Sequence, residues 1–211
     1  MTFLSAMDSS GGLTLDDIIR SRRSVRHFLP QPVSRELLAS LLELASQAPS
    51  AHNSQPWRFV VLQDQVVKHR LAESMGAVLR DTRLADGDAV GLVDADVACS
   101  IVRIDEAPVA VLVCMTAADL DVYPDAARKE AEITLGVQST ALAAGHLLLA
   151  AHAAGLGACW MCAPLFSGSA VRAAVDFPDD WIPQALLVMG YPRREGKQTG
   201  RRDLKEVVLW R

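Results

Sequence analysis

Aromatic residues are scarce in this sequence, and neither sign of charge dominates it. Phe, Trp and Tyr make up 5% of the 211 residues, whereas apolar residues make up 50%. The formal net charge is -4, so the chain lacks the surplus of Lys and Arg that a nucleic-acid surface needs. No low-complexity tract interrupts the sequence. We therefore expect a folded globular protein that binds no nucleic acid.

The sequence also lacks the marks of export. Residues 1–12 have no basic flank, apolar stretch or cleavage site of a signal peptide, and we expect them to form a flexible N-terminus. Cysteine is infrequent as well, and the apolar neighbours of all four cysteines predict buried thiols in a reducing compartment. These four residues are Cys99, Cys114, Cys159 and Cys162. A cytoplasmic location is the expectation.

Charged residues are missing from one long stretch. Between Ile133 and Val171 there is no Asp, Glu, Lys or Arg, which is a length that could span a bilayer. Its Gln, His and many small residues make it less hydrophobic than a Leu/Ile span, so we expect a helix buried on all sides and no membrane contact. His146 and His152 lie six residues apart and therefore on opposite faces of that helix, where packing roles are expected.

Hydrophobic periodicity predicts an α+β fold, formed by residues 13–211 as a single domain. One predicted helix begins at Thr14, and a second runs from Ser34 and is closed by Pro49. The other predicted helices are Gln65–Arg80, Ala126–Ala154 and Ser169–Val175. The predicted strands are Trp57–Leu62, Pro108–Met115, Ala158–Met161 and Gln184–Met189, with a strand-like tail at Val207–Trp210. The stretch Leu84–Arg103 has a weak pattern and is expected to be partly helical and mobile. Pro108–Met115 has no polar alternation, which predicts a central strand.

A crowded positive segment follows the first predicted helix. Arg22-Arg23-Ser24-Val25-Arg26 carries three guanidinium groups and a hydroxyl within five residues. Such crowding is costly unless an anion neutralises it, and a phosphate fits through bidentate contacts. In an extended segment Arg22, Ser24 and Arg26 would point the same way. A solvated basic turn is the alternative interpretation.

A second polar segment lies between a predicted helix and a predicted strand. Pro49 to Trp57 is dense in hydroxyl and amide side chains, which can hydrogen-bond the carbonyls and ring nitrogens of a heterocycle. The prolines at both ends restrict its backbone. An ordinary loop of turn-forming residues is the alternative interpretation.

Taken together, RRSVR, APSAHNSQPWRFVVL and GLGACW resemble the nitroreductase family of FMN enzymes. The resemblance covers the chain from about Leu15 to its end. Within that family, YPDAARKEAEITLGVQ, GLGACWM and the ending VVLWR are most similar to the flavin domain attached to the ligase of the deazaflavin coenzyme F-420. The present sequence departs from that pattern because it contains no ligase domain.

The resemblance implies a three-layer α/β/α sandwich with a mainly antiparallel sheet, assembled as an intertwined homodimer with FMN at each subunit interface. It implies that Arg22, Ser24 and Arg26 hold the FMN phosphate and ribityl chain. The segment Pro49 to Trp57, hereafter the polar loop, would come from the partner subunit. Backbone amides of the Gly155-Leu156-Gly157 turn would contact the flavin ring. The residues implied to bind the cofactor are Arg22, Arg23, Ser24, Arg26, Pro49, Ser50, Asn53, Gln55, Leu156, Gly157, Arg201 and Arg202. Apolar surface on the long helix and the tail also favours a second subunit as cover.

The implied reaction is ping-pong hydride transfer from NAD(P)H through FMN to a small organic acceptor such as a nitroaromatic or a quinone. The flavin carries the chemistry, so no catalytic side chain and no metal are predicted. Two alternatives are a free-standing reductase of the dehydro precursor in deazaflavin coenzyme biosynthesis, and a flavin-binding module without turnover.

Two short motifs suggest other chemistry. Cys159 and Cys162 form a C-x-x-C pair, but residues three apart in a strand face opposite sides, and no second pair completes a zinc site. Gly155-Leu156-Gly157 lacks the third glycine of a dinucleotide fingerprint and precedes a strand rather than a helix. We therefore expect neither a redox dithiol nor a Rossmann dehydrogenase.

Overall fold

One antiparallel sheet organises the protein. The computed structural model describes residues 13–211, so the expected flexibility of residues 1–12 lies outside the described residues. The four strands are β1 (Trp57–Leu62), β2 (Val109–Thr116), β3 (Gly157–Met161) and β4 (Trp181–Gly190), in the order β1-β2-β4-β3. Each neighbouring pair is antiparallel. β2 therefore has a partner on both sides, as predicted for a central strand.

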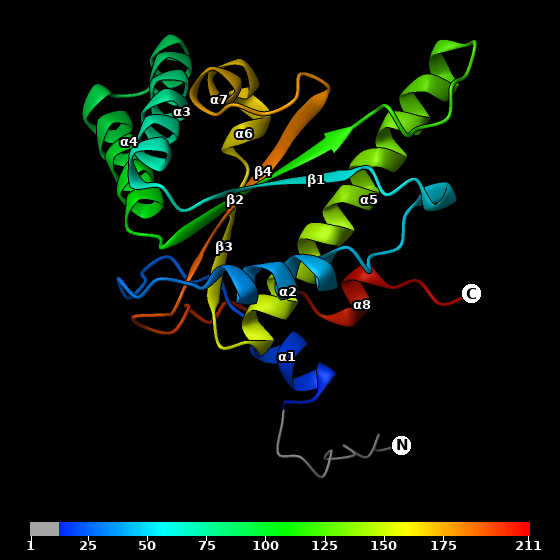
Figure 1. Ribbon diagram of the computed structural model, residues 1–211, viewed down its shortest axis with the longest axis horizontal. Helices are drawn as coiled ribbons and strands as arrows, with labels where there is room; N and C mark the ends of the chain where they lie inside the picture. Colours follow the sequence, from blue (N-terminus) through cyan, green and yellow to red (C-terminus); the bar gives the residue numbers. More distant parts are fainter. Residues whose placement is uncertain (1–12) are drawn as a thin grey trace.

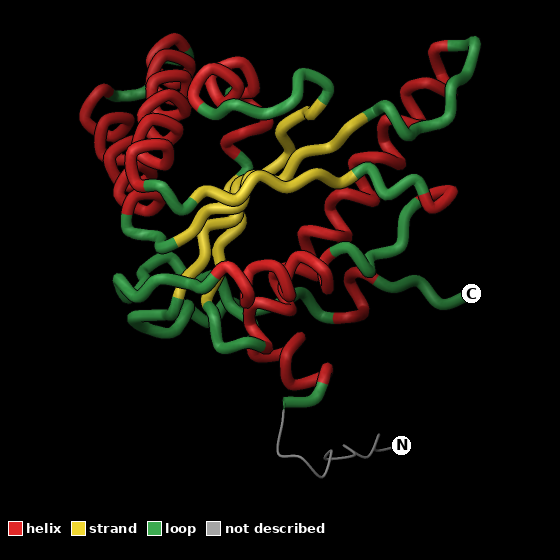
Figure 2. The backbone as a smooth tube through the Cα atoms, viewed as in Figure 1, coloured by secondary structure: helices red, strands yellow, loops and turns green. Residues whose placement is uncertain are grey.

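Helices cover both faces of the sheet (Figure 1, Figure 2). The layer on one face contains α3 (Gln65–Ala85), α4 (Val90–Asp105), α6 (Ala163–Phe166) and α7 (Gly168–Ala174). The layer on the other face contains α2 (Arg35–Ala45) and the long helix α5 (Ala126–Ala153). The remaining short helices are α1 (Leu15–Ser21), which contacts α5, the 3-10 turn η1 (Ala51–Asn53) and α8 (Leu204–Val207).

The alternating side chains of β2 explain the three layers. Ala110, Leu112 and Cys114 point into the core beneath α3 and α4, whereas the intervening valines point into the core beneath α2 and α5. All eight residues of β2 are buried. A strand buried on both faces needs no polar positions, which accounts for its unbroken apolar run. The predicted α+β class and its three-layer arrangement are confirmed.

Side-chain caps fix where several helices begin. Thr14 starts α1 through a capping box, in which the Asp17 amide donates to Thr14 Oγ1 at 3.2 Å and the Asp17 carboxylate accepts from the Thr14 amide at 3.1 Å. Ser34 caps α2, and Asp125 caps α5 by accepting from the Arg128 amide at 2.9 Å. The starts predicted at Thr14 and Ser34 are therefore confirmed.

The stretch Leu84–Arg103 is helical, as expected in part, and more regular than its weak pattern indicated, because most of it belongs to the helix α4. Val93 and Ile104 bury one side of α4 in the core. The outer face carries acidic residues that pair with α3, as in the 2.7 Å contact between Arg80 Nε and Asp94 Oδ1. These charges interrupted the apolar pattern and weakened the helical signal in the sequence.

The prediction of a strand-like tail is also wrong. The chain forms the helical turn α8 at Leu204–Val207, because the Asp203 carboxylate caps it by accepting from the Lys205 amide at 2.9 Å. In the described part of the chain, residues 208–210 pair with no strand. Leu209 and Trp210 are exposed.

The cysteines are buried only in part. Cys114 and Cys159 lie in the core, and burial raises the pKa of the Cys114 thiol to about 12. Cys99 and Cys162 are exposed, which contradicts the prediction for these two. Cys99 lies on the outer face of α4, and Cys162 follows the last residue of β3, so neither points into a core.

The helix α5 packs through one face only. Its buried residues recur at helical spacing and include Gly136, Ala143, Ala144, Leu147 and Ala151, whereas Val137 and Leu142 are exposed. The expectation of a helix buried on all sides is thus wrong for the described chain. By length and composition, α5 contains an 18-residue window, with a mean hydropathy of 1.4, that is apolar enough to cross a membrane. Core helices pass the same test, and α5 packs on the sheet and on α2.

Candidate functional site

The positive segment Arg22–Arg26, hereafter the arginine segment, runs beside the edge strand β3. Ser24 forms a parallel bridge with Ala158, and the Val25 amide donates to the Ala158 carbonyl at 3.0 Å. Gly157 permits this approach, because a Cβ at that position would lie 2.6 Å from Val25 Cβ. Packing against Val25 is therefore a sufficient reason for a glycine in the turn.

The side chains of the arginine segment alternate between two sides. Val25 is buried, and Arg23 turns to the same side, where both line a cavity. The alternation of an extended backbone predicts that Arg22, Ser24 and Arg26 face the opposite side. The common direction of these three side chains stays a prediction.

Two of the cations on this face are available to an anion. Within residues 13–211, neither Arg22 nor Arg26 takes part in an ion pair. The neighbouring Arg20 is neutralised by Asp16, with 2.7 Å between Nε and Oδ2. Arg23 is partly engaged, since its Nη1 donates to the carbonyls of Arg20 and Arg22 at 2.6 and 2.8 Å. Its Nε is buried and has no hydrogen-bond partner in the described chain.

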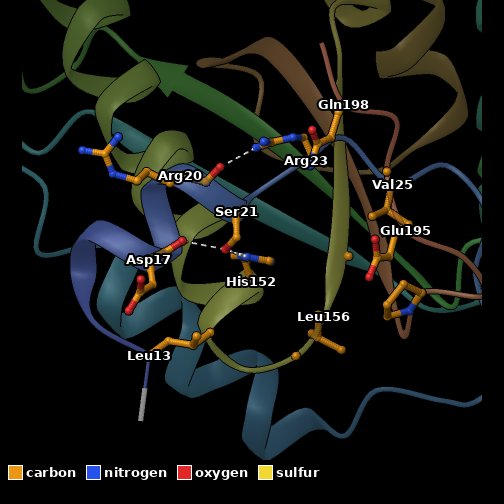
Figure 3. A pocket seen from close by; sticks show the side chains of 14 residues that line it. Leu13, Asp17, Arg20, Ser21, Arg23, Val25, His152, Leu156, Glu195 and Gln198 are labelled. Atoms are coloured by element: carbon orange, nitrogen blue, oxygen red, sulfur yellow. Dashed lines mark hydrogen bonds between the residues drawn. The ribbon is translucent and has the colours of Figure 1, made fainter. Parts of the chain in front are cut away.

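A cavity of about 710 Å³ adjoins the arginine segment on the side of Arg23 and Val25 (Figure 3). Its walls come from α1, the end of α5, the turn before β3 and residues 192–198. Among the twelve residues predicted to bind the cofactor, it brings together Arg23, Leu156 and Gly157.

A hydrogen bond between two helix ends forms one wall of this cavity. Ser21 Oγ, at the last residue of α1, lies 2.7 Å from His152 Nε2, near the end of α5. Burial lowers the pKa of His152, and the positive charges of Arg22 and Arg23 lower it further. The imidazole is therefore neutral at pH 7. Packing was expected for His152, but its contact with Ser21 could not be foreseen from the sequence.

The turn after α5 uses its amides to end the helix. Gly155 adopts a φ of +77°, and its amide donates to the His152 carbonyl at 3.0 Å. The Leu156 amide donates to the Ala151 carbonyl at 2.8 Å, and the Leu156 side chain is buried. These two amides are not free to bind a ligand, so the geometry does not support their expected contact with a flavin ring.

The polar loop contains concentrated backbone strain. His52, Asn53 and Gln55 all have positive φ, at 52°, 54° and 46°, although none is glycine. Such conformations cost about 1 to 3 kcal/mol each and gather at functional sites. Ser50 Oγ supports the loop by accepting from the Gln55 amide at 3.1 Å. This strain was not foreseen, although His52 and Asn53 are residue types that adopt positive φ more often than most; Gln55 is not.

The polar loop is docked on α5, away from the arginine segment. The Ala51 amide donates to Ser139 Oγ at 3.3 Å, and a shallow cavity of about 210 Å³ separates Pro49 and Ser50 from Leu142. In Figure 1, η1 lies beyond one end of β1, far to the side of β3 and its paired arginine segment. One chain therefore does not bring the two predicted halves of the cofactor site together.

Residues 192–198 pack against the arginine segment and line the same cavity. Phe28 forms a bridge with Pro192, and Gly196 packs so closely that a Cβ there would lie 2.5 Å from Arg23 Cβ. Farther along, Arg201 Nη1 folds onto the Thr199 carbonyl at 3.2 Å, and Arg202 is exposed. Within the described chain, no bond joins either arginine to the arginine segment, so their role at a phosphate stays a prediction.

Comparison with known proteins agrees with this architecture. Over 208 residues the chain is 32% identical to an NADH dehydrogenase of Thermus thermophilus, covering 90% of this chain and 92% of that protein. Over 193 residues it is 33% identical to a 5,6-dimethylbenzimidazole synthase of Rhodospirillum rubrum, covering 86% and 83%. The solved structure of oxidized iodotyrosine deiodinase bound to FMN and 3-iodo-L-tyrosine matches with a TM-score of 0.72 and 25% identity, covering 94% of this chain and 98% of that one.

The family assignment rests on a match across most of the chain. Residues 19–191 match the nitroreductase family, a range that contains the arginine segment, the polar loop and all four strands. The chain belongs to the nitroreductase family.

Proposed function

We propose that this chain is an FMN-dependent oxidoreductase that transfers hydride from NAD(P)H to a small organic acceptor in a ping-pong cycle, as a homodimer with FMN at each interface. The observation that carries the proposal is the arginine segment. Arg22 and Arg26 flank Ser24 in the chain, each two residues away from it, and neither cation has a carboxylate partner within residues 13–211. A phosphate group would neutralise both guanidinium groups and accept from all three side chains.

The residues present fit FMN. A phosphate requires cations and hydroxyl donors, which the arginine segment offers, and a heterocycle requires amide groups, which Asn53 and Gln55 offer. Ser54 Oγ in the same loop is buried and has no hydrogen-bond partner among the described residues. When bound, FMN supplies the hydride-accepting and hydride-donating chemistry between nicotinamide and acceptor. FMN-bound relatives such as iodotyrosine deiodinase support the same cofactor.

A second copy of the chain would complete the site. The outer face of α5 exposes Val137 and Leu142, and Gly145 leaves open space where a Cβ would lie. Apolar surface of this kind favours contact with another subunit. Since the polar loop is docked beside Leu142, a partner that covers α5 also receives this loop. The dimer would then bring Pro49, Ser50, Asn53 and Gln55 of one subunit to the arginine segment of the other.

Each group of residues would have a separate task. Arg22, Ser24 and Arg26 bind the phosphate and fix the cofactor in place. The strained loop holds Asn53 and Gln55 in a defined orientation before the ligand arrives, so little entropy is lost when their amides bind the heterocycle. The partner subunit excludes water from the interface site. No side chain of the chain is assigned a proton-transfer role.

Anaerobic addition of NADH or NADPH to the FMN-loaded protein tests the reaction. We expect the yellow flavin absorbance to bleach with at least one donor and to return when a quinone or nitroaromatic is added after the donor has been removed. Recovery in this order is the signature of a ping-pong cycle. Absence of bleaching with both donors would instead support a flavin-binding module without turnover.

The relatives also support a second candidate. Because the chain is 33% identical to a 5,6-dimethylbenzimidazole synthase, we propose formation of 5,6-dimethylbenzimidazole as the second candidate activity. Mass spectrometry of reaction mixtures that contain NADPH, FMN and air would detect it.

Neither the matched family nor the relatives named above point to the deazaflavin ligase, so the expected closeness to its flavin domain is unsupported. A screen with the dehydro precursor would still test that substrate. The cytoplasmic location also stays a proposal.

A further inference from the structure

The hydrogen bond between Ser21 and His152 has a defined direction. Ser21 Oγ donates its only proton to the Asp17 carbonyl at 2.6 Å, so it can only accept from the imidazole. His152 must therefore carry a proton on Nε2, and as the neutral side chain it has none on Nδ1. Figure 3 shows Ser21 and His152 directed toward one another in the wall of the cavity, behind the arginine segment.

This bond is a specific anchor for the start of the arginine segment. None of the seven residues of α1 is buried in the described chain, so apolar packing contributes little to its position. Arg22 follows Ser21 directly and caps α1, since its amide donates to the Ile18 carbonyl at 3.0 Å. Fixing Ser21 on α5 therefore restricts where Arg22 can lie.

The other end of the segment is held independently. Ser24 and Val25 are bound to Ala158 of β3, and the bond between Ser21 and His152 adds a side-chain anchor on α5 at the start of the segment. With that bond broken, α1 and Arg22 gain freedom, and a ligand must restrict them again when it binds.

We propose that His152 is a positioning residue for the flavin phosphate, which holds Arg22 in place through Ser21 and takes up a proton when the phosphate binds. The inference rests on the proposed function, because it assumes a phosphate on Arg22. It adds a residue, His152, that the family resemblance did not assign.

Charge explains the proton uptake. The charged side chains around His152 are Arg22 and Arg23 of the arginine segment, with Asp17, Arg20 and Glu195 in the walls of the same cavity. The first two arginines oppose protonation of His152 in the free protein. A phosphate on Arg22 offsets part of their positive potential, so the pKa of His152 rises toward its ordinary value. In the window below about pH 6.5, the complex then holds more protons than the free protein.

Variants of the two residues test the anchor. His152→Ala and Ser21→Ala are each expected to raise the Kd for FMN about fivefold, the value of one hydrogen bond, and the double variant no further. His152→Gln keeps a donor for Ser21 and should stay within about twofold of wild type at pH 8. His69→Gln, on α3 at the other face of the sheet, is the matched control with unchanged affinity. Thermal unfolding of each apo variant verifies its fold.

Calorimetry tests the proton. FMN is titrated at pH 6 in two buffers of different ionisation enthalpy, for wild type and His152→Gln. Wild type should take up more protons per FMN than the variant, while riboflavin, which has no phosphate, shows no such difference. The ionisation of the phosphate itself, with a pKa near 6, is common to both proteins and cancels in the comparison.

The outcomes separate the two proposals. Equal affinities of wild type, His152→Ala and Ser21→Ala, or equal proton uptake by wild type and His152→Gln, would overturn the role of His152 while the FMN site stands. A wild-type protein that binds no FMN would overturn both.

Discussion

Replacing Arg22 and Arg26 together by alanine is expected to weaken FMN binding about a thousandfold and to leave the fold intact. Each guanidinium bound to a phosphate contributes about 1.5 to 3 kcal/mol, and two such losses correspond to roughly three powers of ten. Neither arginine has an ion pair to lose within residues 13–211, and Arg26 is exposed, so the apo protein has little reason to become unstable. Flavin fluorescence titration measures the Kd, and thermal unfolding verifies the fold.

The control for this double variant removes two positive charges at positions far from the arginine segment. Arg35→Ala with Arg103→Ala deletes two guanidinium groups from α2 and α4, away from the arginine segment, and should leave FMN affinity unchanged. Riboflavin provides a second comparison, because the Arg22→Ala, Arg26→Ala protein should lose far less affinity for it than for FMN. If the double variant kept the FMN content of wild type, the phosphate would have to bind elsewhere.

Introducing charge on the outer face of α5 is expected to abolish the dimer and the bound flavin together. Val137→Asp with Leu142→Asp places two carboxylates on surface that the dimer would bury, and burying unpaired charge is strongly unfavourable. The subunits should separate in sedimentation velocity experiments. FMN should be lost in parallel, since the polar loop then no longer reaches the arginine segment of the other chain.

A matched pair of substitutions distinguishes this effect from a general surface defect. Val66→Asp with Leu92→Asp adds the same charges at exposed apolar positions of α3 and α4, and should change neither mass nor flavin content. A monomeric Val137→Asp, Leu142→Asp protein that still bound FMN as tightly as wild type would show that one chain forms the whole site.

Much of the fold could be predicted because its causes are local. Thr14 and Ser34 cap helices through bonds to residues three positions away. The apolar run of β2 reflects burial on both faces, which a continuous hydrophobic pattern records directly. α4 was foreseen only in part, because acidic residues that pair with α3 disrupted its apolar pattern. α8 was missed although its cause is also local, since a cap at Asp203 starts a helical turn just before the apolar tail.

The candidate site was predictable in composition and not in arrangement. The arginine segment could be recognised because its chemistry lies within five consecutive residues. The contact between Ser21 and His152 joins residues 131 positions apart, and neither residue type alone indicates a partner. The positive φ angle of Gln55 carried no sequence signal, because glutamine is not a residue type enriched at positive φ. The turn amides of Gly155 and Leu156 matched the family pattern but are used to end α5.

The amount and the location of bound FMN test the central claim most directly. Purified wild-type protein is saturated with FMN and sedimented while the flavin absorbance is followed. The expected result is one FMN per chain, moving with a particle of twice the 22.8 kDa chain mass. Protein that stays colourless in excess FMN, or flavin that moves with single chains, would contradict a phosphate site completed by two subunits.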